Sequence, residues 1–361
     1  MTYRPLFVLL AASALALSSC AGAPAQKGPT DAPATSAGTA APDATADSAD
    51  SADSADSADS AGQESQYPLT VNNCGTEVTF AAAPSRVVTA KSSTMEALLA
   101  LGVGDSIVAT SFPDGPLPQW LEAAGAANPA VVTPLSDQLP SLEAVLDLSP
   151  DLVYVGWESN LSADGIGARE TFTQLGVNTY VAPSACKDPK FAPAPLTYDL
   201  VFSEISELGQ IFDAVPTAER LIAEQRAQLA LITPDDRGLT ALWYSSGSKT
   251  PFVGGSQGSA QLAMDTVGLT NIAGEIKDSW GSMSWAKVIE ADPDVIVLVD
   301  SAWGSTEKKI GVLRDNPVTA QLSAVKNDRY LVVPFPATEA GVRSVSAATD
   351  LAAQLAKLQL P

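Results

Sequence analysis

The chain has 361 residues and a formal net charge of −21, from 41 acidic and 20 basic side chains. This length accommodates two domains, and so acidic a chain is a poor partner for nucleic acid or for an anionic lipid surface. The chain has no histidine, which argues against an imidazole-based catalytic centre and against a zinc or manganese site. We therefore expect neither an enzyme nor a bound metal or cofactor.

The N-terminal 66 residues are predicted to lie outside the fold. Residues 1–19 hold one arginine ahead of an apolar run that is too short to span a bilayer, as in an export signal. The small residues before Cys20 resemble the lipobox of bacterial lipoproteins, which implies cleavage before Cys20 and lipid on its thiol. An ordinary signal peptide with an incidental cysteine is the alternative. Residues 20–66, rich in Ala, Ser and Asp, are predicted to form a disordered tether.

From Tyr67 onward, strand and helix patterns alternate in two blocks, which we call the first lobe (67–212) and the second lobe (235–361). Such alternation favours parallel sheets. In the first lobe we predict strands at 69–71, 77–80, 86–90, 107–110, 152–155 and 179–181, and helices at 92–101, 141–148, 168–175 and 198–212. In the second lobe we predict strands at 239–244, 295–299 and 330–333, and helices at 259–266, 284–291 and 345–358.

A single long helix is predicted between the lobes, in residues 213–234. The stretch from Pro216 to Ile232 has apolar residues at the 3.6-residue period of an amphipathic helix. Asp213 can act as its N-cap, and Pro216 suits the first turn because that turn needs no N–H donor there. Pro234 ends the helix.

The two lobes repeat one sequence unit. Ser141 to Val153 matches Ser284 to Ile296 position by position, and each consists of a helix pattern, then Pro-Asp, then an apolar strand. Two copies on either side of a helix indicate two similar lobes with a cleft between them. The sequence therefore predicts an α/β fold of two doubly wound, Rossmann-like lobes with mostly parallel sheets, joined by one long helix.

The repeated unit, the linking helix and the lipobox together resemble the helical-backbone class of ABC-transporter substrate-binding proteins, which includes binders of iron–siderophores, cobalamin and haem. The resemblance covers residues 67–361. It implies that the protein captures a small molecule between its lobes and delivers it to an ABC permease and ATPase. It also implies a monomer on the outer face of the cytoplasmic membrane of a bacterium, held there by lipid on Cys20.

Four stretches are similar to proteins identified as binders of F-420-0, the precursor of the deazaflavin coenzyme F-420. These stretches are 67–75 (YPLTVNNCG), 157–165 (WESNLSADG), 239–247 (LTALWYSSG) and 333–343 (VPFPATEAGVR). The likeness implies an anionic organic ligand, with F-420-0 as the leading candidate. A ferric siderophore or cobalamin is the alternative ligand. An envelope lipoprotein that acts only as a protein-interaction module is the alternative function.

The candidate ligand-binding residues follow the predicted strands, because ligands of open α/β sheets bind beyond the carboxyl ends of the strands. Aromatic side chains suit a flat ring, Ser and Asn suit a polyol chain, and cations suit a phosphate or carboxylate. The candidates are Lys91, Ser92, Phe112, Trp157, Glu158, Asn160, Tyr244, Ser245, Trp280, Trp303, Phe335 and Arg343. Ser93, Lys187, Gln257 and Glu339 are further polar residues at such strand ends.

Two cysteines, Cys74 and Cys186, follow Cys20. In an exported protein we expect them to form a disulfide. The bridge would close a loop of about a hundred residues, which the chain-entropy model values at up to about 4–5 kcal/mol. Because both cysteines belong to the first lobe, the bridge would not restrain motion between the lobes.

The resemblance also implies a docking site for the permease. In the cobalamin and siderophore binders a glutamate on each lobe pairs with arginines of the permease, and the matching residue of the first repeat is Glu143. The second repeat has Ala286 at that position. Docking is therefore either asymmetric, or Glu290 takes the role one turn later.

Overall fold

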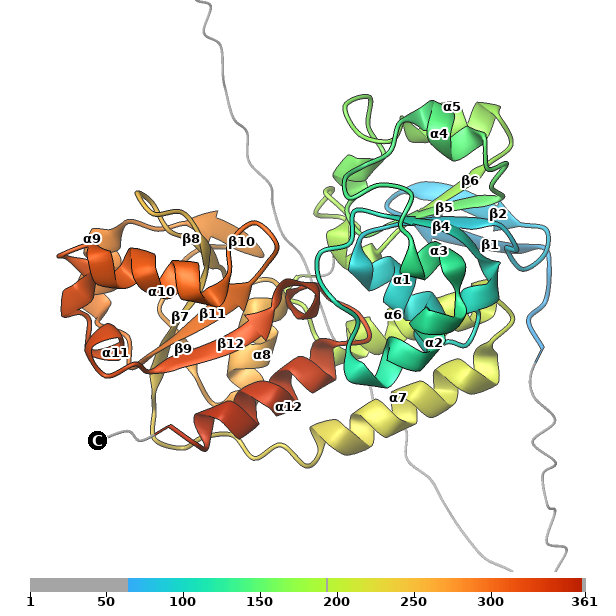
Figure 1. Ribbon diagram of the computed structural model, residues 1–361. Coiled ribbons are helices and arrows are strands. Elements are labelled where there is room, and N and C mark those ends of the chain that lie inside the picture. Colours follow the sequence, from blue (N-terminus) through green and yellow to red (C-terminus); the bar gives the residue numbers. More distant parts are fainter. Residues whose placement is uncertain (1–63, 193, 359–361) are drawn as a thin grey trace, which may run out of the picture. The chain divides into compact units, whose positions relative to one another are not determined.

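A computed structural model describes residues 64–192 and 194–358 (Figure 1). The predicted signal peptide, the lipobox with Cys20 and most of the predicted tether lie outside the described residues. Within the described part, no helix combines the length and the apolar character that crossing a membrane requires.

The first lobe is built around a four-stranded parallel sheet, with the strand order β4-β3-β5-β6. Its strands are β3 (Val87–Ala90), β4 (Ile107–Ser111), β5 (Leu152–Val155) and β6 (Asn178–Val181). β3 and β5 are buried along their whole length, which suits central strands covered on both faces. A separate antiparallel hairpin precedes the sheet and consists of β1 (Leu69–Asn73) and β2 (Thr76–Phe80).

The second lobe is built around a six-stranded mixed sheet, with the order β10-β8-β7-β11-β12 and with β9 also paired to β7. β7, β9, β11 and β12 pair in parallel, whereas β8 is antiparallel to β7 and β10. The strands are β7 (Thr240–Ser246), β8 (Phe252–Gly254), β9 (Thr270–Asn271), β10 (Trp280–Ser282), β11 (Val295–Asp300) and β12 (Tyr330–Pro334). The three strands that the sequence did not predict have two or three residues each, too few to show a period of two.

Helices pack against both sheets (Figure 1). The first lobe has α1 (Ser92–Ala100), α2 (Glu122–Ala127), α3 (Pro129–Val132), α4 (Leu142–Leu146), α5 (Arg169–Gln174) and α6 (Tyr198–Ile211). The second lobe has α8 (Ser259–Val267), α9 (Trp285–Ala291), α10 (Thr306–Asp315), α11 (Ser323–Lys326) and α12 (Ser344–Leu355). These elements confirm the predicted α/β fold of two lobes.

The linking helix is α7 (Val215–Leu229), drawn in yellow in Figure 1. It starts one residue before the predicted stretch and ends three residues before Ile232. Asp213 is not its N-cap, because that position is occupied by Ala214; Asp213 has a φ of 53° and accepts a hydrogen bond from the Ser65 N–H at 2.7 Å. Ala218 of α7 packs in the core of the first lobe.

The two lobes also contact one another at the start of α12. Val342 and Val345 belong to the same buried cluster as α6 and α7, although α12 follows the last strand of the second lobe. Gln225 of α7 donates a hydrogen bond to the Val342 carbonyl at 3.1 Å. The segment before α12 is therefore held against the first lobe by both packing and hydrogen bonding.

The repeated Pro-Asp unit has the same structural role in each lobe. Asp151 accepts hydrogen bonds from the N–H groups of Ser85 and Arg86, at 2.8 and 3.0 Å, just before β3. Asp294 accepts hydrogen bonds from the N–H and hydroxyl of Thr240, both at 2.8 Å, at the start of β7. β5 pairs with β3, and β11 pairs with β7. Each aspartate thus fixes the start of the neighbouring strand.

A disulfide joins Cys74 to Cys186, with their Cα atoms 5.2 Å apart. It connects the β1–β2 turn to the segment after β6. The Asn73 side chain supports the same junction, because it donates to the Val181 carbonyl at 2.7 Å and accepts from the Val181 N–H at 2.8 Å. Arg169 donates to the Asn73 carbonyl at 2.9 Å. The hairpin is therefore attached to the sheet edge by covalent and polar contacts together.

Candidate functional site

A pocket of about 560 Å³ is lined by residues of both lobes. From the first lobe it receives the residues after β5, including Trp157 and Glu158, and those after β6, from Ser184 to Lys187. The second lobe contributes Phe335 and three segments: Gln257 to Ser259, Lys277 to Trp280, and Thr338 to Ala340. The pocket thus lies beyond the carboxyl ends of β5, β6 and β12, where parallel sheets bind ligands.

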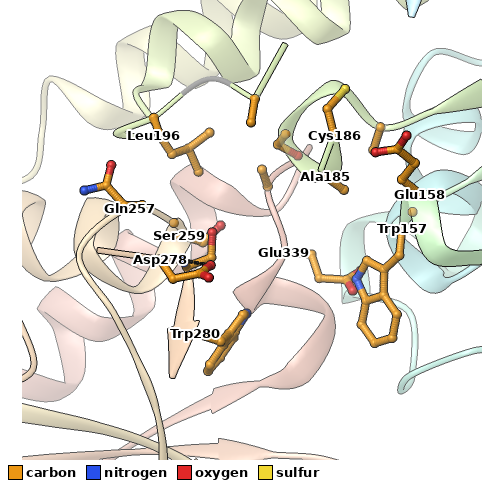
Figure 2. Close-up of a pocket in the computed structure, with 18 of the residues that line it drawn as sticks. Trp157, Glu158, Ala185, Cys186, Leu196, Gln257, Ser259, Asp278, Trp280 and Glu339 are labelled. Atoms are coloured by element: carbon orange, nitrogen blue, oxygen red, sulfur yellow. Dashed lines mark hydrogen bonds between the residues drawn. The ribbon is translucent and has the colours of Figure 1, made fainter. Parts of the chain in front are cut away.

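The two lobes contact one another beside this pocket. The Leu196 N–H donates a hydrogen bond to the Gln257 carbonyl at 2.8 Å, and both residues line the pocket (Figure 2). The hydroxyls of Tyr198 and Thr266 are 3.1 Å apart. These contacts hold both ends of α8 against the start of α6 and the segment before it.

Aromatic rings form two sides of the pocket. Trp157 and Phe335, one from each lobe, meet edge to face with their ring centroids 6.4 Å apart. Trp280 lies on the other side (Figure 2) and stacks on Phe252 at 6.0 Å. Trp303 supports Phe335 from behind, with a centroid distance of 4.6 Å. This arrangement offers apolar faces to a ligand that has a flat ring.

Lys91 lies behind the aromatic rings and is fully buried. Its ammonium nitrogen is 3.7 Å from the ring centroid of Trp157, 4.4 Å from that of Phe112 and 4.9 Å from that of Phe335. The same nitrogen pairs with the carboxylate of Asp114. Burial raises the pKa of Asp114, and the charge of Lys91 opposes this rise. The charge of Lys91 is therefore compensated by a buried carboxylate. Lys91 is not among the residues that line the pocket.

The backbone holds Lys91 in an unusual conformation. Lys91 directly follows β3 with φ 88° and ψ 151°, a region that is occupied almost only by glycine and costs about 1–3 kcal/mol. Phe112 directly follows the neighbouring β4 and also has a positive φ, of 51°. Gly156 makes the close approach possible, since a Cβ there would lie 2.9 Å from the Lys91 Cβ. These local constraints point the lysine and the phenylalanine toward Trp157.

Glu339 lines the pocket close to this buried lysine. Both of its carboxylate oxygens are buried, and neither has a hydrogen-bond partner within the described residues. Oε1 is 3.6 Å from the Lys91 ammonium nitrogen. Burial raises the pKa of Glu339 to about 7, and the charge of Asp114 adds to the rise. Lys91 opposes it, as do Ser93 and Trp157 to a smaller extent.

Four of the sequence candidates line the pocket, namely Trp157, Glu158, Trp280 and Phe335. Five others support them from behind or beside. Asn160 accepts a hydrogen bond from the Trp157 N–H at 3.2 Å, and Ser92 accepts one from the Asp114 N–H at 2.8 Å. Lys91, Phe112 and Trp303 pack against the aromatic rings.

Three candidates lie away from the pocket lining. The guanidinium of Arg343 is buried and pairs with Glu96 of α1, and it also donates to the Pro116 carbonyl at 2.7 Å. The ring of Tyr244 packs on Trp285 at a centroid distance of 5.5 Å, and its hydroxyl donates to the Gly247 carbonyl at 3.2 Å. Ser245 is buried in β7. These side chains have structural contacts that a linear sequence does not reveal.

The sequence prediction missed several lining segments, among them the following two. Residues from Lys277 to Ser279 reach the pocket because they precede the short strand β10, which pairs with β8. The Asp278 carbonyl accepts a hydrogen bond from the Gln257 N–H at 3.2 Å, which fixes this segment beside α8. Ser184 and Ala185 lie in a turn of 3₁₀ helix directly before the bridged Cys186. Cys186 and the candidate Lys187 were the sequence signals next to them.

The ionisable side chains of the lining do not form a cationic site. Lys187 and Lys277 share the lining with the carboxyl side chains of Glu158, Asp278 and Glu339, and both lysines are exposed. In the described part of the chain, no group of three or more Cys, Asp or Glu side chains is arranged to hold a metal ion. The pocket therefore suits an organic ligand better than a bare metal ion.

The predicted docking residues lie on the surface. Glu143 is exposed near the start of α4. Ala286 is exposed at the matching place in α9, and so is Glu290 one turn later. Lys287, next to Ala286, pairs with Glu275. At this exposed position the first repeat therefore has a carboxylate, Glu143, and the second repeat has none.

Comparison with known proteins identifies the family. The sequence model of the periplasmic binding protein family matches residues 87–337. The chain is 22% identical over 294 residues to YvrC, an uncharacterized ABC transporter substrate-binding lipoprotein of Bacillus subtilis. This match covers 79% of this chain and 85% of the relative.

Solved structures agree with this match. A periplasmic binding protein from Veillonella parvula has a TM-score of 0.69 and 27% identity, and the match covers 81% of this chain and 98% of that one. A protein described as an ABC-type Fe³⁺-hydroxamate transport system, from Saccharomonospora viridis, also has a TM-score of 0.69 and 27% identity, with 80% and 99% covered. The chain therefore belongs to the periplasmic binding protein family, a family of solute-binding proteins and not of enzymes, and it is of the ABC-transporter substrate-binding type.

Proposed function

We propose that this protein is the extracytoplasmic receptor of an ABC importer and that it binds coenzyme F-420-0 in the pocket between its lobes. The observation that supports this ligand best is the pair of aromatic sides, Trp157 with Phe335 and, across the pocket, Trp280. A volume of about 560 Å³ lies within the usual range of small-molecule sites. A deazaflavin ring between these sides would bury both of its faces.

The rest of the ligand would contact the polar lining. Hydroxyl and amide groups of Ser184, Gln257 and Ser259 are suited to the hydroxyls of the ribityl chain. The phosphate end would contact Lys187 and Lys277, which line the pocket and are exposed. This differs from the expectation for Lys91 and Arg343, because their charges are paired with Asp114 and Glu96.

A ferric hydroxamate siderophore is the second candidate. The similarity to the Saccharomonospora viridis protein favours it. Such a siderophore supplies all the ligands of its own iron, so a pocket without a metal-binding cluster is no obstacle. The three carboxyl side chains in the lining also suit a neutral or cationic siderophore better than an anionic one.

Titration of the purified protein, followed by deazaflavin fluorescence, tests the proposal. We expect F-420-0 to bind with a dissociation constant of about 1 μM or lower. Trp280→Ala should weaken binding about tenfold, because it removes one aromatic face from the ligand. Trp120→Ala is a suitable control, since Trp120 is exposed outside the pocket. If F-420-0 fails to bind while ferrioxamine B binds, the second candidate replaces the first.

The remaining parts of the proposal concern delivery. We propose that lipid on Cys20 holds a monomer at the outer face of the cytoplasmic membrane, and that Glu143 contacts the permease. The Bacillus subtilis relative is named a lipoprotein, which supports the anchor. A Cys20→Ala variant should appear in the soluble fraction or remain as an uncleaved precursor. Normal processing with full membrane retention would contradict the anchor.

A further inference from the structure

We propose that Glu339 selects ligands by accepting a hydrogen bond from an N–H group of the ligand. The chemical class is a ligand that presents an imide, amide or ammonium N–H at the aromatic side of the pocket. The inference rests on the proposed function, because it assigns the partner of one side chain in the same pocket.

The first observation is the unmet hydrogen-bonding capacity of Glu339. Both carboxylate oxygens are buried without a hydrogen-bond partner in the described residues, although Glu339 lines the pocket. A buried polar group without a partner costs about 1–3 kcal/mol, and more if it is charged. Native structures contain few such groups, and a missing ligand is one physical explanation for this one.

The second observation is that the neighbours of Glu339 leave it unsatisfied. Lys91 is the nearest cation, but its nitrogen is 3.6 Å from Oε1, beyond hydrogen-bond distance, and it pairs more closely with Asp114. The Ser93 hydroxyl and the Trp157 indole favour the charged form of Glu339, yet neither forms a hydrogen bond of normal geometry with it. Burial outweighs these contributions, because the pKa of Glu339 remains raised to about 7, so a further donor would stabilise the carboxylate.

The third observation is the position of Glu339 relative to the aromatic rings. Its side chain lies beside Trp157 (Figure 2), and Phe335 starts the short 3₁₀ helix that directly precedes Glu339. A flat ring placed against Trp157 and Phe335 would present its edge to the carboxylate. The edge of a deazaflavin carries the imide N–H of its pyrimidinedione ring. A siderophore could present a pendant ammonium or amide at the same point.

Selectivity follows from the cost of leaving the carboxylate unpaired. A site built to pair with a polar group of the ligand rejects an analogue that lacks this group far more strongly than an apolar pocket rejects an extra methyl group. Methylation of the ligand N–H removes the donor and places a methyl group against Glu339. Affinity should therefore fall when either the ligand N–H or the Glu339 carboxylate is removed, and removing both should cost little more than removing one.

The experiment compares two pairs of probes on wild type, Glu339→Gln and Glu219→Gln. The first pair is F-420-0 and its derivative methylated at the imide nitrogen. The second pair is ferrioxamine B, which has a free ammonium group, and its trimethylammonium derivative, which keeps the charge but has no N–H. Glu219 is exposed on α7, so its variant controls for the loss of one charge. The methylation arm on wild type needs no variant and is independent of folding.

We expect Glu339→Gln to weaken binding of the donor probe about tenfold to a hundredfold, which corresponds to about 1.4–2.8 kcal/mol. Methylation should cost wild type a similar factor and should cost Glu339→Gln much less. F-420-0 that binds wild type and Glu339→Gln equally, with no effect of methylation, overturns the inference and leaves the proposed function intact. If only ferrioxamine B binds and shows the donor effect, the inference holds and F-420-0 is the wrong ligand. If neither probe binds wild type, both proposals fail.

Discussion

Lys91→Met is the substitution whose effect the structure defines best. Methionine fills nearly the same space as the lysine side chain among Phe112, Trp157 and Phe335, but it removes the charge. Asp114 and Glu339 then remain buried without their shared cation. We expect the variant to lose stability first, and to lose ligand binding only as a consequence of disturbed packing.

The size of the loss follows from the two carboxyl groups. Removing one partner of a buried ion pair costs about 3–5 kcal/mol. Protonation limits the cost, since placing a proton on an aspartate at pH 7 costs at most about 4 kcal/mol. Glu339, whose pKa is about 7, takes up a proton at little cost. The lost cation–π contacts are partly replaced by contacts between the methionine sulfur and the rings. We therefore expect a loss of about 3–5 kcal/mol at pH 7.5.

Urea unfolding at pH 7.5 and pH 5 measures this effect. In the variant, the pKa values of Asp114 and Glu339 lie above their unfolded values, so the folded state binds extra protons and its stability rises as the pH falls from about 7 toward 5. The deficit relative to wild type should shrink accordingly. Lys190→Met is the matched control, because Lys190 is exposed and also lies over an aromatic ring, that of Phe191 at 5.1 Å. A Lys91→Met protein as stable as wild type that no longer binds ligand would refute this reasoning and make Lys91 a direct ligand contact.

Three further predictions concern Glu339, Glu204 and Glu143. The pKa of Glu339 is about 7, and an N–H donor favours its carboxylate. Affinity for the ligand should therefore fall as the pH drops from 8 to 5, by up to about tenfold per pH unit below pH 7. A fluorescence titration in which Glu339→Gln shows the same dependence on pH would contradict this. Burial raises the pKa of Glu204 to about 8, so wild type loses stability as the pH rises from about 4.5 to 8. In urea unfolding, Glu204→Gln should therefore be more stable than wild type by about 1–3 kcal/mol at pH 9 and by much less at pH 5. A stabilisation that does not depend on pH would assign the effect to packing. Glu143→Ala should reduce uptake in cells without changing ligand affinity, as for a charge at the rim of an interface; a weaker affinity of the purified variant would place Glu143 in ligand binding instead.

The fold could be predicted from the sequence because its main elements are long enough to show their periods. The strands at 152–155 and 295–299 follow matching Pro-Asp pairs, and the structure shows why: Asp151 and Asp294 each accept hydrogen bonds from the start of the neighbouring strand. The failures occur where an element is short or is fixed by distant contacts. The strands β8 to β10 have two or three residues; β8 and β9 pair with β7, and β10 pairs with β8.

The candidate site was predicted in its aromatic residues but not in its cations. Trp157 and Phe335 line the pocket because they follow β5 and β12, which the sequence pattern defines, whereas Trp280 begins β10, a strand too short to be predicted. Lys91 and Arg343 also occupy strand and helix ends, yet each is paired with a carboxylate that lies far away in sequence: Asp114 for Lys91 and Glu96 for Arg343. Sequence position gives the end of an element, whereas the partner of a charge depends on the packing of the whole fold.

This distribution of charge determines which part of a ligand the pocket can discriminate. The exposed lysines that line it, Lys187 and Lys277, can form ion pairs worth only about 0–1 kcal/mol, and salt weakens them further. A hydrogen bond to the buried carboxylate of Glu339 is worth about 1.5–3 kcal/mol and is little affected by salt. The ring and its N–H group should therefore decide which ligand is bound, while the phosphate end adds affinity without much selectivity. Raising the salt concentration should then weaken binding of F-420-0 only slightly, whereas blocking its N–H should weaken it strongly.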